Sequence, residues 1–469
     1  MSPSVGGAGV PRPSRQAPRP SRPPRLLVVA YHFPPAEAVG ARRPAALARA
    51  AVAAGWEVRV LCAGGPDATV DGLAPADVVR VRSWRLPSGR LGGGAAAVGL
   101  PVSGSAWPPG RGRLAPARIA APVRAVAREI LHLPDPEAGW IVPAVRAGRA
   151  LCHRWSPDVV VASGPPFSVL LVAALLARRL GVPWVADYRD LWTVGNEYWG
   201  HGRSRIRRFL DHRLERRMLH TVARCVTVSE PLARTLRETF GVPADVVMNG
   251  VDGRPRPTGP TTSLVAPDVD PSSLVLVHTG LLYPGRRDPT PLLRAVALLG
   301  DDRRRVRVVL AGPETAAAHE AAARCGVPDV VSVVGQVSAV DSWQLQAAAD
   351  VLVLLMWDDP RDAGTVPGKL FDYLLARRPI LMVGHPDGVA ADLIRSRGAG
   401  VVLGDPVAIA ARLRDWLALK ERTGRIEALP ENVMDGLFRE DQMRGYLDLL
   451  ATVAGRERAP ATADVVARS

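Results

Sequence analysis

RLLVVAYHF, residues 25–33, is a short and nearly continuous run of apolar side chains. A strand that is apolar on both faces is typical of a parallel sheet covered by helices on both sides. A second run of the same kind, LVLVHTG at residues 274–280, opens the second half of the chain. Together the two runs predict an α/β fold with one parallel sheet in each half.

Further runs of this kind recur along both halves, with helical segments between them. They lie at 56–62, 158–164, 183–188 and 225–230, and then at 306–312, 330–335, 350–357, 379–384 and 399–404. Strands that alternate with helices form doubly wound sheets, which bind ligands at the carboxyl ends of their strands. We therefore expect two doubly wound, Rossmann-like domains with a cleft between them.

Length and a change in composition set the expected domain boundaries. The 469 residues exceed the roughly 250–300 residues at which one hydrophobic core stops growing. Residues 253–273 are rich in proline, threonine and aspartate, as a linker is. We expect a first domain at 25–252 and a second from 274. Residues 1–24 are expected to form a disordered tail and residues 91–112 a surface loop.

Charge narrows the classes of partner. The net charge is +15, and Lys369 and Lys420 are the only lysines among 60 basic residues. The arginine excess reflects composition, yet it favours anionic partners such as phosphates or acidic lipid surfaces. The basic residues scatter over both halves without a nucleic-acid motif, so no nucleic-acid partner is expected.

Cysteine content and hydropathy indicate the compartment. The four cysteines stand far apart, which fits neither a disulfide framework nor a zinc site. No run reaches the roughly 18 apolar residues of a membrane span, and residues 1–24 lack the apolar stretch of a secretory signal. We therefore expect a cytoplasmic protein.

The segment GTVPGKLFDYL, residues 364–374, leaves a strand through a glycine-containing loop and enters a helix. Lys369 and Asp372 stand three apart and share a face of that helix. A nucleoside diphosphate needs cations and N–H donors for its phosphates and a carboxylate for its ribose hydroxyls. The segment therefore predicts a nucleotide site, although a surface Lys–Asp pair is the simpler alternative.

Three other clusters follow strands. Gly280 opens a loop that carries Arg286, a cation for a departing phosphate or one member of a solvated basic turn. Gly40 precedes a helix expected to begin near Arg42, as a phosphate loop or an ordinary turn does. Asp187, Arg189 and Asp190 end a strand, where they orient an acceptor hydroxyl or form a buried ion pair.

Residues 203–224 combine apolar and basic periodicity. Apolar side chains recur at spacings of three and four, at Ile206, Phe209, Leu210, Leu214, Met218 and Val222, and arginines fill much of the remainder. This pattern predicts a helix with its apolar stripe on the sheet and its arginines in water. In a second interpretation the arginines rest on anionic headgroups at the inner face of the cell membrane.

Six segments occur in a characteristic order: YHFPP with Gly40, then residues 187–192, 227–241, 249–252, 280–287 and 367–381. In this order they resemble the retaining glycosyltransferases of family 4, over about residues 25–415. The resemblance implies the GT-B fold, in which two Rossmann-like domains face a central cleft. It also implies a nucleotide-sugar donor bound mainly on the second domain, no metal ion, and retention of the anomeric configuration.

In enzymes of this kind the chain crosses back near its end. The resemblance therefore implies a second domain at 274–430 and a helix within 431–454 that packs on the first domain. Residues 455–469 are expected to form a second disordered tail.

The resemblance and the chemistry above together assign roles. Donor binding falls to Gly40, Gly280, Arg286, Pro367, Gly368, Lys369 and Asp372. The catalytic residues are expected to be Arg286, Lys369 and Asp190, and the acceptor side comprises Asp187, Arg189 and Asp190. No cofactor is expected beyond the nucleotide sugar.

Two departures from the family pattern concern charge. The family's arginine and lysine after the first strand of the second domain fall on Leu281 and Arg286, so one of two cations is missing. Where the family often has two glutamates eight apart, this chain has Gly364 and Asp372. The carboxylate that faces the transferred sugar in relatives is therefore absent at position 364.

The expected function is sugar transfer in the synthesis of a cell-surface polysaccharide or glycolipid, with a glycan, lipid-linked or small-molecule acceptor. The alternatives are transfer to a small natural product, a nucleotide-sugar 2-epimerase and a non-catalytic homologue. An epimerase needs acid/base carboxylates and histidines around the sugar, and the glycine at 364 argues against it.

Overall fold

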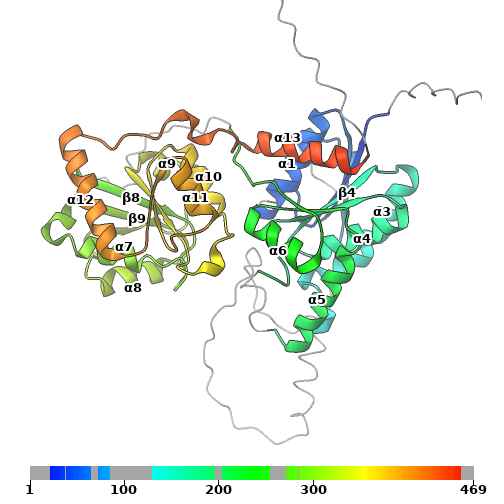
Figure 1. The fold of residues 1–469 in the computed structure, drawn as a ribbon, viewed down its shortest axis with the longest axis horizontal. Coiled ribbons are helices and arrows are strands. Elements are labelled where there is room, and N and C mark those ends of the chain that lie inside the picture. The colour runs from blue at the N-terminus through cyan, green and yellow to red at the C-terminus, as the bar shows by residue number, and fades with distance from the viewer. Residues whose placement is uncertain are drawn as a thin grey trace, which may run out of the picture.

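A computed structural model describes residues 22–36, 38–64, 72–84, 129–195, 203–253, 270, 272–283 and 285–455. The two expected tails and the expected linker lie mostly outside these residues, and the loop expected at 91–112 lies wholly outside them. The described residues form two parallel sheets with helices on both faces of each (Figure 1). The α/β fold predicted from the alternating apolar runs is therefore confirmed.

The first sheet has the spatial order β3-β2-β1-β4-β5-β6-β7. In sequence order its strands are β1 (Arg25–Ala30), β2 (Glu57–Ala63), β3 (Val78–Val81), β4 (Val159–Gly164), β5 (Trp184–Tyr188), β6 (Arg224–Thr227) and β7 (Ala244–Val246). Strand β1 pairs in parallel with both β2 and β4, so the strand order reverses there. Such a reversal opens a crevice at the carboxyl ends of the strands.

Helices cover the two faces of the first sheet with separate apolar cores. Helices α3 (Ile141–Arg154), α4 (Ser168–Leu180), α5 (Arg205–Leu219) and α6 (Glu230–Phe240) share one core, and α1 (Val39–Ala53) and α13 (Arg439–Val453) share the other. In α4 the buried side chains of Val169, Val172, Ala173 and Leu176 recur at helical spacing. Burial of such a stripe stabilises the helix on the sheet.

The second sheet has the order β10-β9-β8-β11-β12-β13. Its strands are β8 (Leu274–Thr279), β9 (Val306–Ala311), β10 (Val331–Val333), β11 (Val351–Leu355), β12 (Ile380–Val383) and β13 (Gly400–Leu403). One face carries α7 (Thr290–Ala297), α8 (Thr315–Arg324) and α12 (Pro406–Thr423), and the other carries α9 (Ala339–Ala348), α10 (Gly368–Leu375) and α11 (Val389–Ser396). Short 3₁₀ turns are η1 (Pro75–Asp77), η3 (Pro136–Trp140), η5 (Gly300–Arg305), η6 (Pro360–Asp362) and η7 (Glu431–Met434).

The chain passes twice between the two domains, and the two passages lie side by side. The N–H of Arg439 donates to the carbonyl of Val251 at 2.8 Å, and Val251 and Phe438 form a parallel bridge. Gly250 has φ +62°, and a Cβ atom there would lie 2.8 Å from Cα of Arg439, so the close approach requires glycine. Helix α13 then packs on α1 (Figure 1).

The return crossing begins later than position 431. Val433, Met434 and Leu437 are buried in the core of the second domain, so the segment that contains η7 still belongs to it. The first-domain core takes up Met443, Tyr446, Leu447 and Leu450 from α13.

Two helices differ from the sequence-based expectation. Helix α1 begins at Val39, so Gly40 lies within its first turn and not in a loop before it. In α5 the expected apolar stripe is wrong at its first turns: Ile206 is 56% and Phe209 65% exposed. Arg207 faces inward instead, because it pairs with Asp211 at 2.8 Å and donates to the carbonyls of the segment before η3.

A buried ion pair joins four parts of the first domain. Nε of Arg43, on α1, donates to Asp187, at the end of β5, at 2.9 and 3.0 Å, and both side chains are at most 2% exposed. Arg43 also donates to the carbonyl of Met248 at 3.1 Å and lies 5.7 Å from the ring of Tyr446 on α13. The pair therefore links α1, β5, the exit to the second domain and the returning helix.

We predict that Asp187→Asn destabilises the protein by about 3–5 kcal/mol, because it leaves the Arg43 guanidinium buried without a counter-charge. Urea unfolding of both proteins measures the loss. The matched control is Asp245→Asn, which breaks a pair with Arg224 that is more than a third exposed on both sides and should cost less than about 1 kcal/mol. Equal losses in the two variants would contradict the prediction.

Candidate functional site

A cleft of about 520 Å³ lies between the two domains. Its first-domain wall comes from the start of α1, the residues after β5 and the segment 249–252. Its second-domain wall comes from Arg287, the loop after β11 and the start of α10. The cleft is therefore bounded by the carboxyl ends of strands from both sheets, where doubly wound domains bind ligands.

Lys369 lies on the second-domain wall of this cleft, in the first turn of α10. Its Nζ atom is buried and has no hydrogen-bond partner within the described part of the chain. Burial lowers the pKa of Lys369 to about 7, aided by the charge of Arg287 and opposed by Glu314. An unpartnered ammonium group beside an open cleft is suited to bind an anion.

Gly280, at the end of β8, makes room for the lysine. A Cβ atom at position 280 would lie 2.6 Å from Nζ of Lys369, and the φ of Gly280 is +118°. Pro367 caps α10, and Gly368 is its first residue. Because α10 begins at the cleft, its first N–H groups also face an anion there. Asp372, one turn further along α10, lines the same cleft.

The arginine doublet after β8 splits into two different positions. Arg287 lines the cleft, whereas Arg286 is not among its lining residues. Arg286 lies over the ring of Trp357 at 4.1 Å, and Arg361 lies over the same ring at 4.5 Å. The N–H of Tyr283 donates to the carbonyl of Arg287 at 3.1 Å, which fixes the loop. The structure thus presents Arg287, not the expected Arg286, to a ligand in the cleft.

The three candidate acceptor residues at the end of β5 also occupy different positions. Arg189 and Asp190 line the cleft, whereas Asp187 is the buried partner of Arg43. The guanidinium of Arg189 donates to the carbonyls of Gly40 and Pro165. A Cβ atom at Gly40 would lie 3.0 Å from Nη2 of Arg189. Gly40 therefore positions this arginine and is not itself among the residues that line the cleft.

The side chain of Asp190 is exposed toward the cleft. Enclosure by the two domains raises the pKa of its carboxyl group, and the charges of Arg189 and Arg287 oppose that rise. The influence of Arg287, from the second domain, places a cation and a carboxylate within electrostatic range across the cleft.

The two domains touch at Gly364. The hydroxyl of Ser229 donates to the carbonyl of Gly364 at 2.7 Å, and a Cβ atom at Gly364 would lie 3.0 Å from Cδ2 of Leu232. Leu232 of α6 therefore occupies space that a longer side chain at 364 would need. The absent carboxylate leaves room for direct contact between the domains.

Several cleft residues had no role assigned from the sequence, among them Arg287, Trp357, Arg361 and Asp362. Asp362, half-buried in η6, accepts a hydrogen bond from the hydroxyl of Thr365 at 2.7 Å. Burial raises the pKa of Asp362, and the charges of Arg287 and Arg286 oppose this. For Trp357, Arg361 and Asp362, the sequence signal was the stretch WDDPRD at 357–362, which follows a buried strand. Asp362 and Asp372 are the carboxylates that the second domain contributes to the lining.

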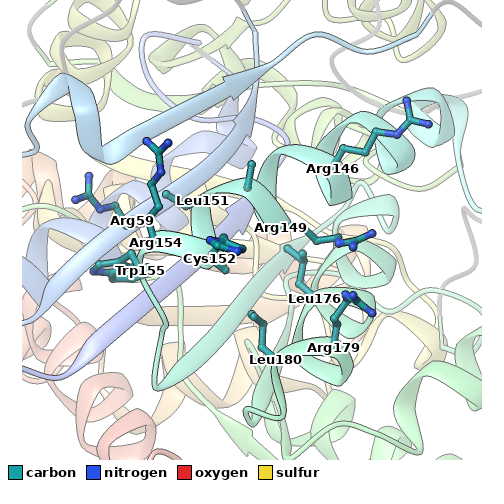
Figure 2. Close-up of a pocket in the computed structure, with 12 residues that line it drawn as sticks. Arg59, Arg146, Arg149, Leu151, Cys152, Arg154, Trp155, Leu176, Arg179 and Leu180 are labelled. Carbon is teal, nitrogen blue, oxygen red and sulfur yellow. The ribbon is translucent and has the colours of Figure 1, made fainter.

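A second hollow, of about 1260 Å³, lies on the first domain away from this cleft (Figure 2). Arginines from β2, α3 and α4 line it, and no carboxylate does. Among its described lining residues there is no carboxylate to accept hydrogen bonds from ribose hydroxyls. The interdomain cleft combines cations, a helix start and carboxylates, and it is therefore the candidate nucleotide site.

No group of three or more His, Cys, Asp or Glu side chains within the described ranges is placed to hold a metal ion. No described helix is both long enough and apolar enough to cross a membrane.

The fold and the cleft define a GT-B enzyme, and comparison with known families shows to which family of such enzymes it belongs. A model described as a glycosyl transferase 4-like domain matches residues 39–250, and one described as glycosyl transferases group 1 matches residues 273–418. The chain belongs to the group 1 glycosyltransferases. The resemblance deduced from the six segments is confirmed in this respect.

Solved structures with the same fold cover almost the whole chain. Sucrose-phosphate synthase from Thermosynechococcus elongatus shares 14% identity at a TM-score of 0.62, over 92% of this chain and 99% of that one. A glycosyltransferase from Rickettsia africae shares 12% at 0.57, over 93% and 100%. Anabaena HepE, solved with UDP-glucose, shares 14% at 0.55, over 91% and 99%. No curated protein matches the chain.

We predict that affinity for the nucleotide-sugar donor falls as the pH rises from about 6 to 9. Its diphosphate requires charged Lys369, whose pKa of about 7 leaves the amine increasingly neutral above that pH. The apparent Kd should rise by up to about tenfold per pH unit above 7. Calorimetry across this range measures it.

Lys369→Arg is the control, because its charge does not titrate in this range. Its binding should be weaker or equal but nearly independent of pH. A wild-type profile as flat as that of the arginine variant would contradict the role of Lys369.

Proposed function

We propose that this glycosyltransferase moves a sugar from a nucleotide-sugar donor to an acceptor hydroxyl, with retention, in the synthesis of a cell-surface polysaccharide or glycolipid. The observation that carries the donor assignment is the buried, unpartnered Nζ of Lys369 beside Arg287 in the cleft. HepE, which has the same fold, was solved with UDP-glucose. That complex supports a nucleotide-sugar donor here.

In the proposed donor pose the diphosphate lies against the start of α10. Lys369, Arg287 and the first N–H groups of the helix meet its negative charge. Asp372 accepts hydrogen bonds from the ribose hydroxyls, and the transferred sugar extends toward Asp362 and Asp190. The cations of the chain supply the charge stabilisation in this proposal, which therefore requires no metal ion.

The reaction exchanges one C–O bond for another at the anomeric carbon. The bond to the diphosphate oxygen breaks, and the nucleoside diphosphate leaves with its electron pair. The acceptor oxygen forms the new bond from the same face, and its proton passes to a phosphate oxygen. Charge develops on the leaving phosphate, where preorganised cations lower the barrier most.

The acceptor approaches from the first-domain wall. Asp190 is exposed there, and Arg189 is held in place by two backbone carbonyls. A carboxylate beside a fixed arginine can accept a hydrogen bond from an acceptor hydroxyl and orient its oxygen. Asp187 supports this wall only indirectly, through Arg43.

We predict that Arg287→Gln lowers kcat/KM for the preferred donor by at least about 100-fold, because it removes a cation from the leaving group. The preferred donor is found first, by hydrolysis or thermal stabilisation with UDP-glucose, UDP-galactose and GDP-mannose. Absence of any response by the wild-type protein would contradict the proposed function.

Arg286→Gln is the matched control, since it removes the same charge one residue away. It should lower kcat/KM by less than about threefold. A larger loss of kcat/KM in Arg286→Gln than in Arg287→Gln would identify Arg286 as the catalytic cation.

For the acceptor side we propose that α5 rests on an anionic membrane surface, where a lipid-linked acceptor would be found. Ile206 and Phe209 are exposed, as are Arg205, Arg208, Arg213, Arg216 and Arg217. Arginines attract anionic headgroups, and exposed apolar side chains enter the headgroup region. The alternative is a soluble acceptor such as a small natural product.

We predict that the protein floats with anionic but not with neutral liposomes at low salt. Replacing Arg205, Arg208, Arg216 and Arg217 by glutamine should lower the bound fraction, because each charge near the surface contributes about 1 kcal/mol. Arg207 is left unchanged because it is buried on Asp211. Equal flotation of wild type and variant would favour the soluble acceptor.

A further inference from the structure

Helices α3, α4 and α5 lie on the same face of the first sheet, and α4 contacts both neighbours (Figure 1). No carboxylate points outward from them. Helices α3 and α4 contain no acidic residue, and the acidic residues of α5, Asp211 and Glu215, are buried. We call their exposed basic side chains the basic face: Arg146, Arg149, His153, Arg154, Arg178, Arg179, Arg205, Arg208, Arg213, Arg216, Arg217 and His220.

Ion pairing does not neutralise the basic face. Within the described residues, the guanidinium groups of Arg149, Arg154 and Arg179 have no carboxylate partner. Several exposed arginines of the second domain differ in this respect: Arg324 pairs with Glu320 and Arg395 with Asp392. Surfaces that only face water usually intersperse both signs of charge. An acid-free face therefore indicates an anionic partner, beyond the general arginine excess of the chain.

The second hollow lies on the basic face, at the C-terminal ends of α3 and α4. Figure 2 shows arginines from β2, α3 and α4 around its leucines and Trp155. The apolar part consists of Leu151, Leu176, Leu180 and the ring of Trp155. Arg59 lies 5.8 Å over that ring and is held by Asp77. The hollow thus combines several guanidinium groups with an apolar floor.

We propose that this hollow binds the headgroup of an anionic phospholipid and that the basic face lies on the membrane surface. Guanidinium groups bind phosphate oxygens in a bidentate geometry. The apolar floor suits the glycerol and the first methylene groups of the same lipid. One ligand with a charged end and an apolar end uses both parts of the hollow.

Exposed apolar side chains on the same helices favour a lipid over a soluble polyanion. Val142 of α3 is 44% exposed and Leu175 of α4 49%, in addition to Ile206 and Phe209 of α5. Apolar side chains scattered among arginines stabilise binding at a membrane interface, where they leave water. If the partner were inorganic phosphate or nucleic acid, these apolar side chains would stay hydrated.

The hollow is separate from the donor site. It lies where α3 and α4 end, whereas the cleft lies at the carboxyl ends of the strands, where the helices begin. Binding there would dock the enzyme and would not deliver the acceptor. Helices α3 and α4 would thus join α5 in docking the enzyme on the membrane. This inference rests on the proposed function only where that function places the acceptor at the membrane.

The test compares the triple variant Arg149→Gln/Arg154→Gln/Arg179→Gln with wild type on vesicles of phosphatidylcholine and phosphatidylglycerol. We expect the partition coefficient to fall by at least about tenfold. Short-chain phosphatidylglycerol, below its micelle concentration, should raise the melting temperature of wild type but not of the variant. The matched control, Arg304→Gln/Arg324→Gln/Arg395→Gln, removes the same charge from exposed positions of the second domain and should partition within about twofold of wild type.

Each other outcome overturns the inference in a distinguishable way. If the α5 variant loses binding and the triple variant does not, the hollow is not a lipid site and the docking of α5 stands. Equal stabilisation by inorganic pyrophosphate would make the hollow a site for a soluble anion, and tight binding of a DNA duplex lost in the triple variant would make it a nucleic-acid site. If wild type ignores vesicles but still binds UDP-glucose, membrane docking fails and the donor assignment survives.

Discussion

The buried pair of Arg43 and Asp187 is the interaction on which the arrangement of the two domains depends. Two charges removed from water are tolerated only when each satisfies the other and the remaining donors find acceptors. Here Nη1 of Arg43 donates to the carbonyl of Met248 and to Oδ1 of Asn249, at the exit to the second domain, and Nη2 lies 2.9 Å from Asp187. Tyr446 of the returning helix packs against the guanidinium. Anything that displaces this arginine would therefore shift α1, the interdomain passage and α13 together. Arg189 and Asp190, which follow Asp187 in sequence after Tyr188, are placed on the cleft wall by it.

The two walls of the cleft carry different charged groups. The second domain contributes cations and two carboxylates, which in the proposed donor pose meet phosphate and hydroxyl groups, and the first contributes a fixed arginine with a carboxylate. At Gly364 the walls meet without a side chain in between, so Ser229 and Leu232 contact the loop directly. A small residue here lets the domains approach more closely than a carboxylate would. In the proposed donor pose, sugar recognition falls to other groups, and Asp362 is the carboxylate of the lining that is nearest to position 364 in sequence.

Both the architecture and the position of Lys369 at the start of a helix could be predicted from the sequence, since apolar runs and a lysine after a glycine-containing loop are local signals. The orientation of adjacent side chains could not. Arg286 and Arg287 are equivalent in sequence, and the bridge between Tyr283 and Arg287 decides which one faces the cleft. The burial of Asp187 depends on Arg43, 144 positions away. In α5 the apolar periodicity was misleading, because Arg207 satisfies backbone carbonyls that no local pattern reveals.

The placement of α13 has a consequence for synthesis of the protein. One core of the first domain is completed by Met443, Tyr446, Leu447 and Leu450, which are among the last described residues of the chain. While the ribosome makes the whole second domain, the apolar side chains of α1 and the sheet beneath them lack this cover. The first domain therefore cannot close its core in order of synthesis, as an independent N-terminal domain would. A chain released before α13 emerges would expose this apolar surface and be prone to aggregate, so a stop codon late in the message would be as damaging to the first domain as to the second.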